Sequence, residues 1–146
     1  MKRLVGIVVL GSVVMCLSAA TVFAQSAIPD LKGKWVSKTY SHHHEKRGFY
    51  STADAGGEWM IKEQQGRFFT GERTYVKKQI KGKKITEGFS GVISRDGKRF
   101  YMVDHDEDMI FGEIVAADIL EMVVMNDGDE NHHAHVGVLE VHKVKP

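Results

Sequence analysis

Cysteine and proline are nearly absent from this chain of 146 residues. The one cysteine is Cys16, which lies in an apolar N-terminal run, and the two prolines are Pro29 and Pro146. Without Cys16, the chain cannot form a disulfide, a thiolate nucleophile or a cysteine-ligated metal site. Its stability must therefore come from the packing of a hydrophobic core, which about 120 residues can supply.

A strong charge of either sign is also lacking. The chain has 20 lysines and arginines against 19 acidic residues, a balance that argues against electrostatic capture of nucleic acid. The N-terminal "MKRLVGIVVLGSVVMCLSAATVFAQS" has two basic residues, an apolar run and small residues up to Ala24, which is the layout of a secretory signal. We predict a signal peptide over residues 1–24, a periplasmic or secreted protein, and no stable membrane anchor after cleavage. The alternative is an uncleaved anchor, although Gly6 and Gly11 dilute the run.

Helical signals are absent after residue 24, whereas strand signals recur. β-Branched and aromatic residues alternate with polar ones between glycine-containing turns. We expect residues 25–146 to form a single all-β domain. The expected strands are residues 33–41, 57–64, 68–76, 87–94, 98–104, 109–116, 119–126 and 134–144. Eight consecutive antiparallel strands predict an up-and-down barrel, which has no exposed edge, and a β-sandwich is the alternative.

The connections between these strands are alternately long and short. Alternate loops of a meander lie at the same end, so the long connections should ring one open mouth. The long connections are residues 42–57, 77–84, 104–108 and 126–135. Closure pairs the last strand with the first, which should place "SHHHE" (41–45) beside "NDGDENHHAH" (126–135).

Four short motifs recur in a known family. They are "GKW" (33–35), "FFTG" (68–71), "FSGVISRDGK" (89–98) and "VHKVKP" (141–146). Their order resembles the secreted avidin- and streptavidin-like barrels, part of the wider calycin group of eight-stranded ligand-binding barrels, over most of residues 33–146. The resemblance implies a barrel, an interior pocket and oligomers. Ser41 matches a serine of the biotin site, but Ser37 and Arg73 replace its Asn and Tyr, so biotin is not the expected ligand.

The strand residues favour binding of a small ligand in the barrel interior or at its open mouth. A polar strand residue that points inward needs a partner and would mark such a site, and Arg73, Glu113 and Glu121 are candidates for this position. The candidate ligand-binding residues are Trp35, Ser37, Trp59, Arg73, Tyr75 and Tyr101. Residues 98–104 and 119–126 are apolar on both faces, which suggests that another subunit covers the outside and predicts a homo-oligomer.

Histidine and acidic residues gather in the long connections, which makes transition-metal binding the alternative function. Neutral imidazole suits zinc, copper and nickel, and neighbouring carboxylates orient such sites. The candidate site is a rim formed by residues 42–45 and 126–135. The candidate ligands are His42, His44, His105, His132, His133 and His135. Solvated polar loops or a pH-responsive rim would explain the same residues, and neither acidic loop matches an EF-hand.

Motifs for catalysis are missing. The sequence has no G-x-S-x-G motif and no glycine-rich phosphate loop. It therefore favours a non-catalytic binding protein over an enzyme, with a small molecule or a metal ion as its partner and no certain cofactor.

Overall fold

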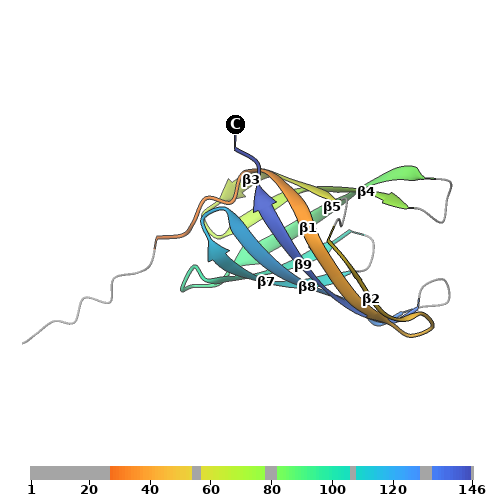
Figure 1. Ribbon diagram of the computed structural model, residues 1–146. Coiled ribbons are helices and arrows are strands. Elements are labelled where there is room, and N and C mark those ends of the chain that lie inside the picture. Colours follow the sequence, from red (N-terminus) through yellow and green to blue (C-terminus); the bar gives the residue numbers. More distant parts are fainter. Residues whose placement is uncertain (1–26, 54–56, 78–81, 106–107, 129–132, 146) are drawn as a thin grey trace, which may run out of the picture.

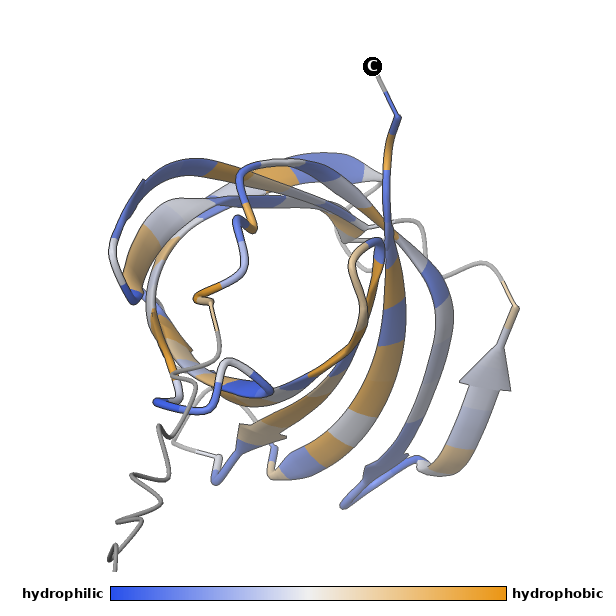
Figure 2. Cartoon of the chain, turned by 90° about the vertical axis from the view of Figure 1, so that its left-hand side faces the viewer, coloured by the Kyte–Doolittle hydropathy of each residue, from blue (hydrophilic) through white to orange (hydrophobic). Residues whose placement is uncertain are grey.

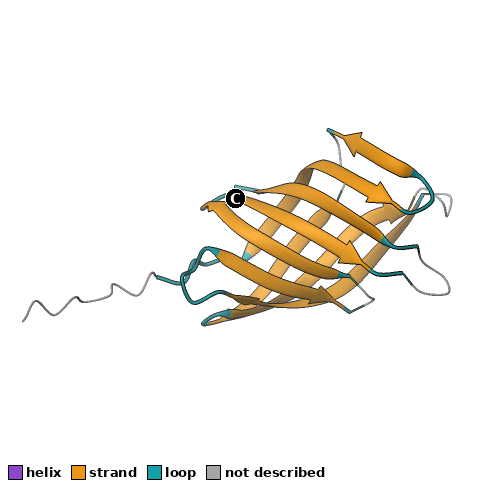
Figure 3. Cartoon of the chain, turned by 90° about the horizontal axis from the view of Figure 1, so that it is seen from below, coloured by secondary structure: helices purple, strands orange, loops and turns teal. Residues whose placement is uncertain are grey.

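The computed structural model describes residues 27–53, 57–77, 82–105, 108–128 and 133–145. The predicted signal peptide and His132 lie outside these residues. In the described part of the chain, every regular element is a β-strand (Figure 3). No helix among these residues is long and apolar enough to cross a membrane.

The strands form one antiparallel sheet that closes on itself. β1 (Gly33–His44) pairs with β3 on one side and with β9 on the other, and the β1–β9 pairing closes the barrel. The barrel consists of β1 and β3 to β9, which confirms the predicted eight-stranded up-and-down barrel (Figure 1). The other strands are β2 (Gly48–Thr52), β3 (Glu58–Gln65), β4 (Phe68–Lys77), β5 (Lys83–Ile93), β6 (Arg99–Asp104), β7 (Met109–Ala116), β8 (Ile119–Asn126) and β9 (His135–Lys143).

A hairpin outside the barrel was not predicted from the sequence. Residues 42–57 were expected to form a loop, but β1 continues to His44 and pairs with β2 from Tyr40 to His44. β1 leaves β3 after Val36 but stays paired with β9 up to His44. In this hairpin, which we call the arm (residues 40–52), β2 therefore lies outside the ring of strands (Figures 1 and 2). β2 covers no core, because its residues are exposed or only half-buried, and so no hydrophobic alternation marks it.

Apolar side chains fill the inside of the barrel. Along the strands, buried apolar residues that point inward alternate with more exposed residues that point outward. This alternation appears as bands of different hydropathy in the view along the barrel axis (Figure 2). The largest fully buried side chains are Trp35, Trp59, Phe89, Phe100, Leu31, Ile93, Ile110, Leu120 and Val141. Six of them line a void of only about 10 Å³, together with Ile61, Phe69, Met102 and Met122. This is roughly the room of one water molecule. This part of the interior is therefore a packed core and has no space for a ligand.

Large rings fit into this core because glycines lie opposite them. Each of three phenylalanines has a glycine as its register partner on the adjacent strand. The pairs are Phe69 with Gly91, Phe89 with Gly71, and Phe100 with Gly112. A Cβ at any of these glycines would overlap the facing ring. The glycines are thus required for space inside the barrel.

The two ends of the barrel differ. At one end Leu31, just before β1, is buried in the core, and its carbonyl accepts a hydrogen bond from Trp35 Nε1 at 2.9 Å. The tight turns lie at this closed end, whereas the strands that flank the long connections meet at the opposite end (Figure 1). The alternation of loop length therefore predicts correctly that the strands flanking the long connections end on the same side of the barrel.

Candidate functional site at the barrel mouth

The inward-facing residues change from apolar to polar just above the core. On β6, Asp104 follows Phe100 and Met102 in the inward series, and on β5 Glu87 precedes Phe89. We call this polar layer the mouth cluster. Its members are Tyr40, Arg73, Tyr75, Glu87, Asp104, Asp108 and Asn126.

Arg73 is the centre of the mouth cluster. Its guanidinium carbon lies 5.0 Å from the ring centre of Trp59 and 4.6 Å from that of Tyr75. Its Nη1 lies 3.2 Å from Asp108 Oδ2 and 3.6 Å from Asp104 Oδ2. The side chains of Arg73, Asp108 and Asp104 are 18%, 16% and 2% exposed. A cation held between two carboxylates therefore lies directly on the core and stays within reach of solvent.

Further hydrogen bonds fix the carboxylates of this layer. The backbone N–H of Asp108 donates to Asp104 Oδ1 at 2.8 Å, and Asn126 Nδ2 donates to Asp108 Oδ1 at 3.0 Å. Tyr75 Oη donates to Glu87 Oε1 at 2.6 Å. Charge-assisted hydrogen bonds of this kind are strong and directional. They join residues of β4, β5, β6 and β8 into one polar network.

Tyr40 completes the cluster from the side of β1. A β-bulge between Ser37 and Thr39 shifts the alternation of β1, so that Tyr40 points inward. Its ring lies against Gly137, where a Cβ would be only 2.5 Å from Tyr40 Cε2. Burial raises the pKa of the Tyr40 hydroxyl, while Arg73 lowers it and Asp108 raises it further. Tyr40 is therefore a neutral hydroxyl that can both donate and accept a hydrogen bond.

Imidazoles continue the inward series of β1 and β9 beyond Tyr40. His44 is the register partner of His135 across these strands. The ring centre of His44 lies 5.7 Å from that of His133 and 6.3 Å from that of His135. The two histidine-rich segments are thus neighbours, as barrel closure predicts.

Two of the imidazoles at the mouth have lowered pKa values. Burial lowers the pKa of His42 and of His44, and the positive charge of Arg47 and of neighbouring histidines lowers both further. The His42 ring lies between Tyr40 and Tyr50, with centroid distances of 4.8 and 5.3 Å, and its buried Nδ1 has no hydrogen-bond partner. At neutral pH these rings form an uncharged aromatic surface at the mouth.

The histidines do not assemble a metal centre in the structure as described. Among the described residues, no group of three or more histidine, cysteine, aspartate or glutamate side chains is placed to hold an ion. The prediction that His105 belongs to the same rim is wrong. Its ring lies on the outer wall against Gly88, with Nε2 3.2 Å from Ser90 Oγ, because it follows the inward-pointing Asp104 and successive strand residues face opposite sides.

The predicted ligand-binding residues on β1, β3 and β4 all face the interior, but at two levels. Trp35, Ser37 and Trp59 are buried in the core, where Trp59 Nε1 donates to Ser37 Oγ at 3.3 Å. Arg73 and Tyr75 belong to the mouth cluster. Trp59 links the two levels, since its ring supports the Arg73 guanidinium.

The remaining predicted residues face outward. Tyr101 is 44% exposed on the outer wall and makes a T-shaped contact with Phe111, so it cannot line an interior site. Successive residues of a strand face opposite sides. Because Phe100 and Met102 point inward on β6, Tyr101 between them points outward. Glu113 and Glu121 are exposed as well. Of the three polar strand residues considered, Arg73 is the one that points inward.

Most of the mouth cluster was missed by the sequence analysis. The members that it did not assign are Tyr40, Glu87, Asp104, Asp108 and Asn126. A usable signal was present, because Asp104 and Asn126 each stand two residues beyond the last apolar inward residue of their strand. Tyr40 gave no such signal, since the bulge in β1 breaks its period.

The arrangement is chemically suited to a cationic or polar guest. Arg73, Glu87, Asp104 and Asp108 together carry one positive and three negative charges. The excess of carboxylates lies beside the rings of Tyr40 and Tyr75 and below the neutral imidazoles. Carboxylates together with aromatic faces are the groups that recognise organic cations.

Comparison with known proteins supports the fold. No known sequence family matches this chain, and no curated protein does. A redesigned β-barrel is similar to it with a TM-score of 0.51 and 7% identity, over 80% of this chain and 92% of that one. Apocrustacyanin C1 aligns with a TM-score of 0.46 and 10% identity. The alignment covers 78% of this chain and 61% of apocrustacyanin C1. The fold of this chain is thus an eight-stranded antiparallel β-barrel, and membership of the avidin-like barrels or of the wider calycin group is not shown.

Proposed function

We propose that this barrel is a non-catalytic binding protein that holds a small molecule at its open mouth. The observation that carries the proposal is the mouth cluster, a network of charged residues on top of a core that has no space of its own. Burying such a network costs free energy, because each charge loses hydration. A role in ligand binding accounts for its presence here. Open ends of small barrels are common ligand sites.

The same geometry favours a ligand with a positively charged nitrogen and an aromatic or apolar part. A positive group would be attracted by the surplus carboxylates of Asp108 and Glu87. Its apolar part would lie against Tyr40 and the uncharged ring of His42. An anionic ligand would meet Arg73 already neutralised by two carboxylates.

Isothermal titration calorimetry with two matched probes tests this proposal. The probes are 2-phenylethylamine, a cation at pH 7, and phenylacetate, which has the same ring and an anionic group. We expect the amine to bind at least about ten-fold more tightly, a difference that one charged hydrogen bond can supply. Equal binding of the two probes, preference for phenylacetate, or no binding of the amine would refute the proposed ligand class.

A pair of variants tests whether the mouth cluster is the site. Asp108→Asn removes one carboxylate charge next to Arg73 and should weaken binding of the amine. Asp118→Asn makes the same change at an exposed position in the β7–β8 turn, far from the mouth, and should leave binding unchanged. If both variants bind like the wild type, the ligand site lies elsewhere.

We also propose that the protein is exported, with cleavage after Ala24. This rests on the basic, apolar and small-residue segments at the N-terminus. Mass spectrometry of the protein from a host with an intact export pathway tests it. A product that begins at Gln25 in the periplasm or medium is expected, and an unprocessed chain retained in the cytoplasm would contradict export.

A further inference from the structure

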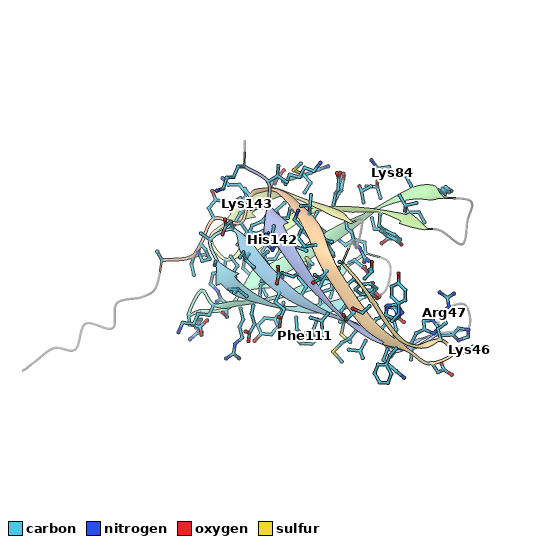
Figure 4. The ribbon with its side chains drawn as sticks, viewed as in Figure 1. Lys46, Arg47, Lys84, Phe111, His142 and Lys143 are labelled. Carbon is cyan, nitrogen blue, oxygen red and sulfur yellow. The ribbon has the colours of Figure 1, made fainter. Side chains whose placement is uncertain are left out.

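Two rows of apolar side chains cross the outside of the barrel. The first row runs from β5 to β9 and the second from β6 to β9. The register partners in one row are Val92, Tyr101, Phe111, Val123 and Val138, and in the other Val103, Met109, Met125 and Val136. Phe68 on β4 extends the first row, and Phe49 on the arm extends the second through His43. We call this set the outer apolar face. Figure 4 shows one of its members, Phe111, projecting from the wall.

The size of the outer apolar face matches one half of a protein interface. Eight of its side chains are 41% to 69% exposed, namely Phe68, Tyr101, Val103, Met109, Phe111, Met125, Val136 and Val138. Because the set includes three valines as well as aromatic residues and methionines, a mean of roughly 170 Å² for each side chain applies, and together they present about 650 Å² of largely apolar surface. Ordinary monomers rarely expose more than a few hundred Å² in one patch, whereas each partner of a standard interface buries about 800 Å².

Charged residues border the face with opposite signs at its two edges. Toward the closed end, Glu113, Glu121 and Glu140 are successive register partners. Arg99 lies 4.0 Å from Glu113, and His142 is hydrogen-bonded to Glu140, so Glu121 at the middle of the row has like charges on both sides, which is unfavourable. Toward the mouth, Lys46 and Arg47 are exposed at the tip of the arm (Figure 4). A two-fold axis through the face exchanges these edges, so the basic tip of one copy would approach the glutamate row of the other.

A projecting ring and a groove lie toward opposite ends of the face. Phe49 projects from the arm with 90% of its surface exposed. The other end has a shallow groove of about 380 Å³, whose apolar lining includes Phe68, Tyr101 and Phe111. The same two-fold axis brings Phe49 of each copy toward the groove of the other. The arm leaves the ring of strands (Figure 2), which lets it reach past the curved wall.

We propose that the outer apolar face is the interface of a two-fold symmetric homodimer, in which Phe49 of each arm enters the groove of the partner. A closed two-fold arrangement satisfies both grooves at once, whereas a head-to-tail one would leave a groove and an arm free at its ends. The interface lies on the barrel wall and leaves the mouth accessible. It goes beyond the proposed ligand binding and does not depend on it.

Analytical ultracentrifugation of the full mature chain tests the dimer. The wild type should sediment as a dimer at about 100 µM, since interfaces of this area associate in the micromolar range or more tightly. Phe111→Glu should sediment as a monomer, because it buries a charge in the groove that the partner's Phe49 is proposed to enter. Thr86→Glu adds the same charge at an exposed site on the outside of β5 away from the face, and should remain a dimer.

The arm is tested separately. Phe49→Ser should raise the dimer dissociation constant about ten-fold or more, because the side chain proposed to fill the groove is lost. It is already exposed in one copy, so this change should not affect folding, and Val103→Lys replaces Phe111→Glu if the latter unfolds. A monomeric wild type, open-ended larger assemblies, or equal dissociation by Thr86→Glu would overturn the proposal.

Discussion

At the scale of single residues, Arg73 determines whether the mouth cluster is stable. Its guanidinium is the charge partner of Asp104, which is almost inaccessible to water, and of Asp108, which is partly exposed. Removing one member of such a group leaves the others buried and uncompensated. The cluster should therefore behave as one unit, whereas charged pairs on the outer wall should not.

We expect Arg73→Met to lower the free energy of unfolding by about 3 kcal/mol, because it removes the cation that lies between the buried carboxylate of Asp104 and the partly buried carboxylate of Asp108. Urea unfolding followed by tryptophan fluorescence measures this. The matched control is Arg99→Met, which removes an exposed pair with Glu113 at 4.0 Å and should change stability by no more than about 0.5 kcal/mol. Equal effects of the two variants would show that burial of the mouth cluster has been overestimated.

At the scale of strands, the barrel depends on the pairing of rings with glycines. Gly112 and Phe100 are register partners on β7 and β6, and the ring occupies the space of the missing side chain. A methyl group there would push the ring into a core with almost no free volume. Strand pairing and core packing are therefore set by the same two residues.

Gly112→Ala should destabilise the protein by about 2 kcal/mol, the usual cost of overpacking a core. Thermal unfolding by circular dichroism measures the loss. Adding Phe100→Leu should recover part of it, since the smaller side chain makes room for the methyl group, and the two changes should be clearly non-additive. A double variant that is as unstable as the sum of the single ones would contradict this packing.

The arm should make stability sensitive to mild acid. Burial lowers the pKa of His42 and His44 below the unfolded value of 6.5, so the unfolded chain binds more protons than the folded one. The contribution of these two imidazoles to the free energy of unfolding is fully present above pH 6.5. It is lost as the pH falls below this value and through their lowered pKa values. His42→Gln should reduce the fall in melting temperature between about pH 6.5 and 5.

The control for this prediction is His43→Gln, whose side chain lies on the opposite face of β1 against Phe49. Melting temperatures of both variants and the wild type, measured across the same pH series, separate the two positions. If His42→Gln retains the full acid sensitivity of the wild type, another titrating group causes it.

The strands themselves could be predicted from sequence, and the arm could not. Each barrel strand buries alternate residues, which leaves a period of two in the sequence. β2 pairs with β1 beyond the barrel and buries no such series, so its residues resemble a loop. The bulges in β1 and β3 also shift the inward phase, and bulges have no reliable signal in a single sequence.

At the scale of the whole molecule, strand count and loop parity were enough to predict the closed barrel and its open end. They also placed the two histidine-rich segments side by side, as the register of His44 with His135 shows. They could not locate Asp104 and Asp108 in one network with Arg73, because that depends on where the chain turns between β6 and β7. Sequence alone thus predicted the frame of the site but not its chemistry.

The two tryptophans allow a direct test of ligand binding at the mouth cluster. The indole of Trp59 lies beneath Arg73, whereas that of Trp35 donates to the Leu31 carbonyl at the closed end. The measurement is a ¹H–¹⁵N correlation spectrum of the mature protein during titration with 2-phenylethylamine. Ligand binding at the mouth cluster should give a saturable shift of the Trp59 indole signal and leave the Trp35 signal stationary. Equal movement of both signals, or shifts confined to residues of the outer apolar face, would contradict it.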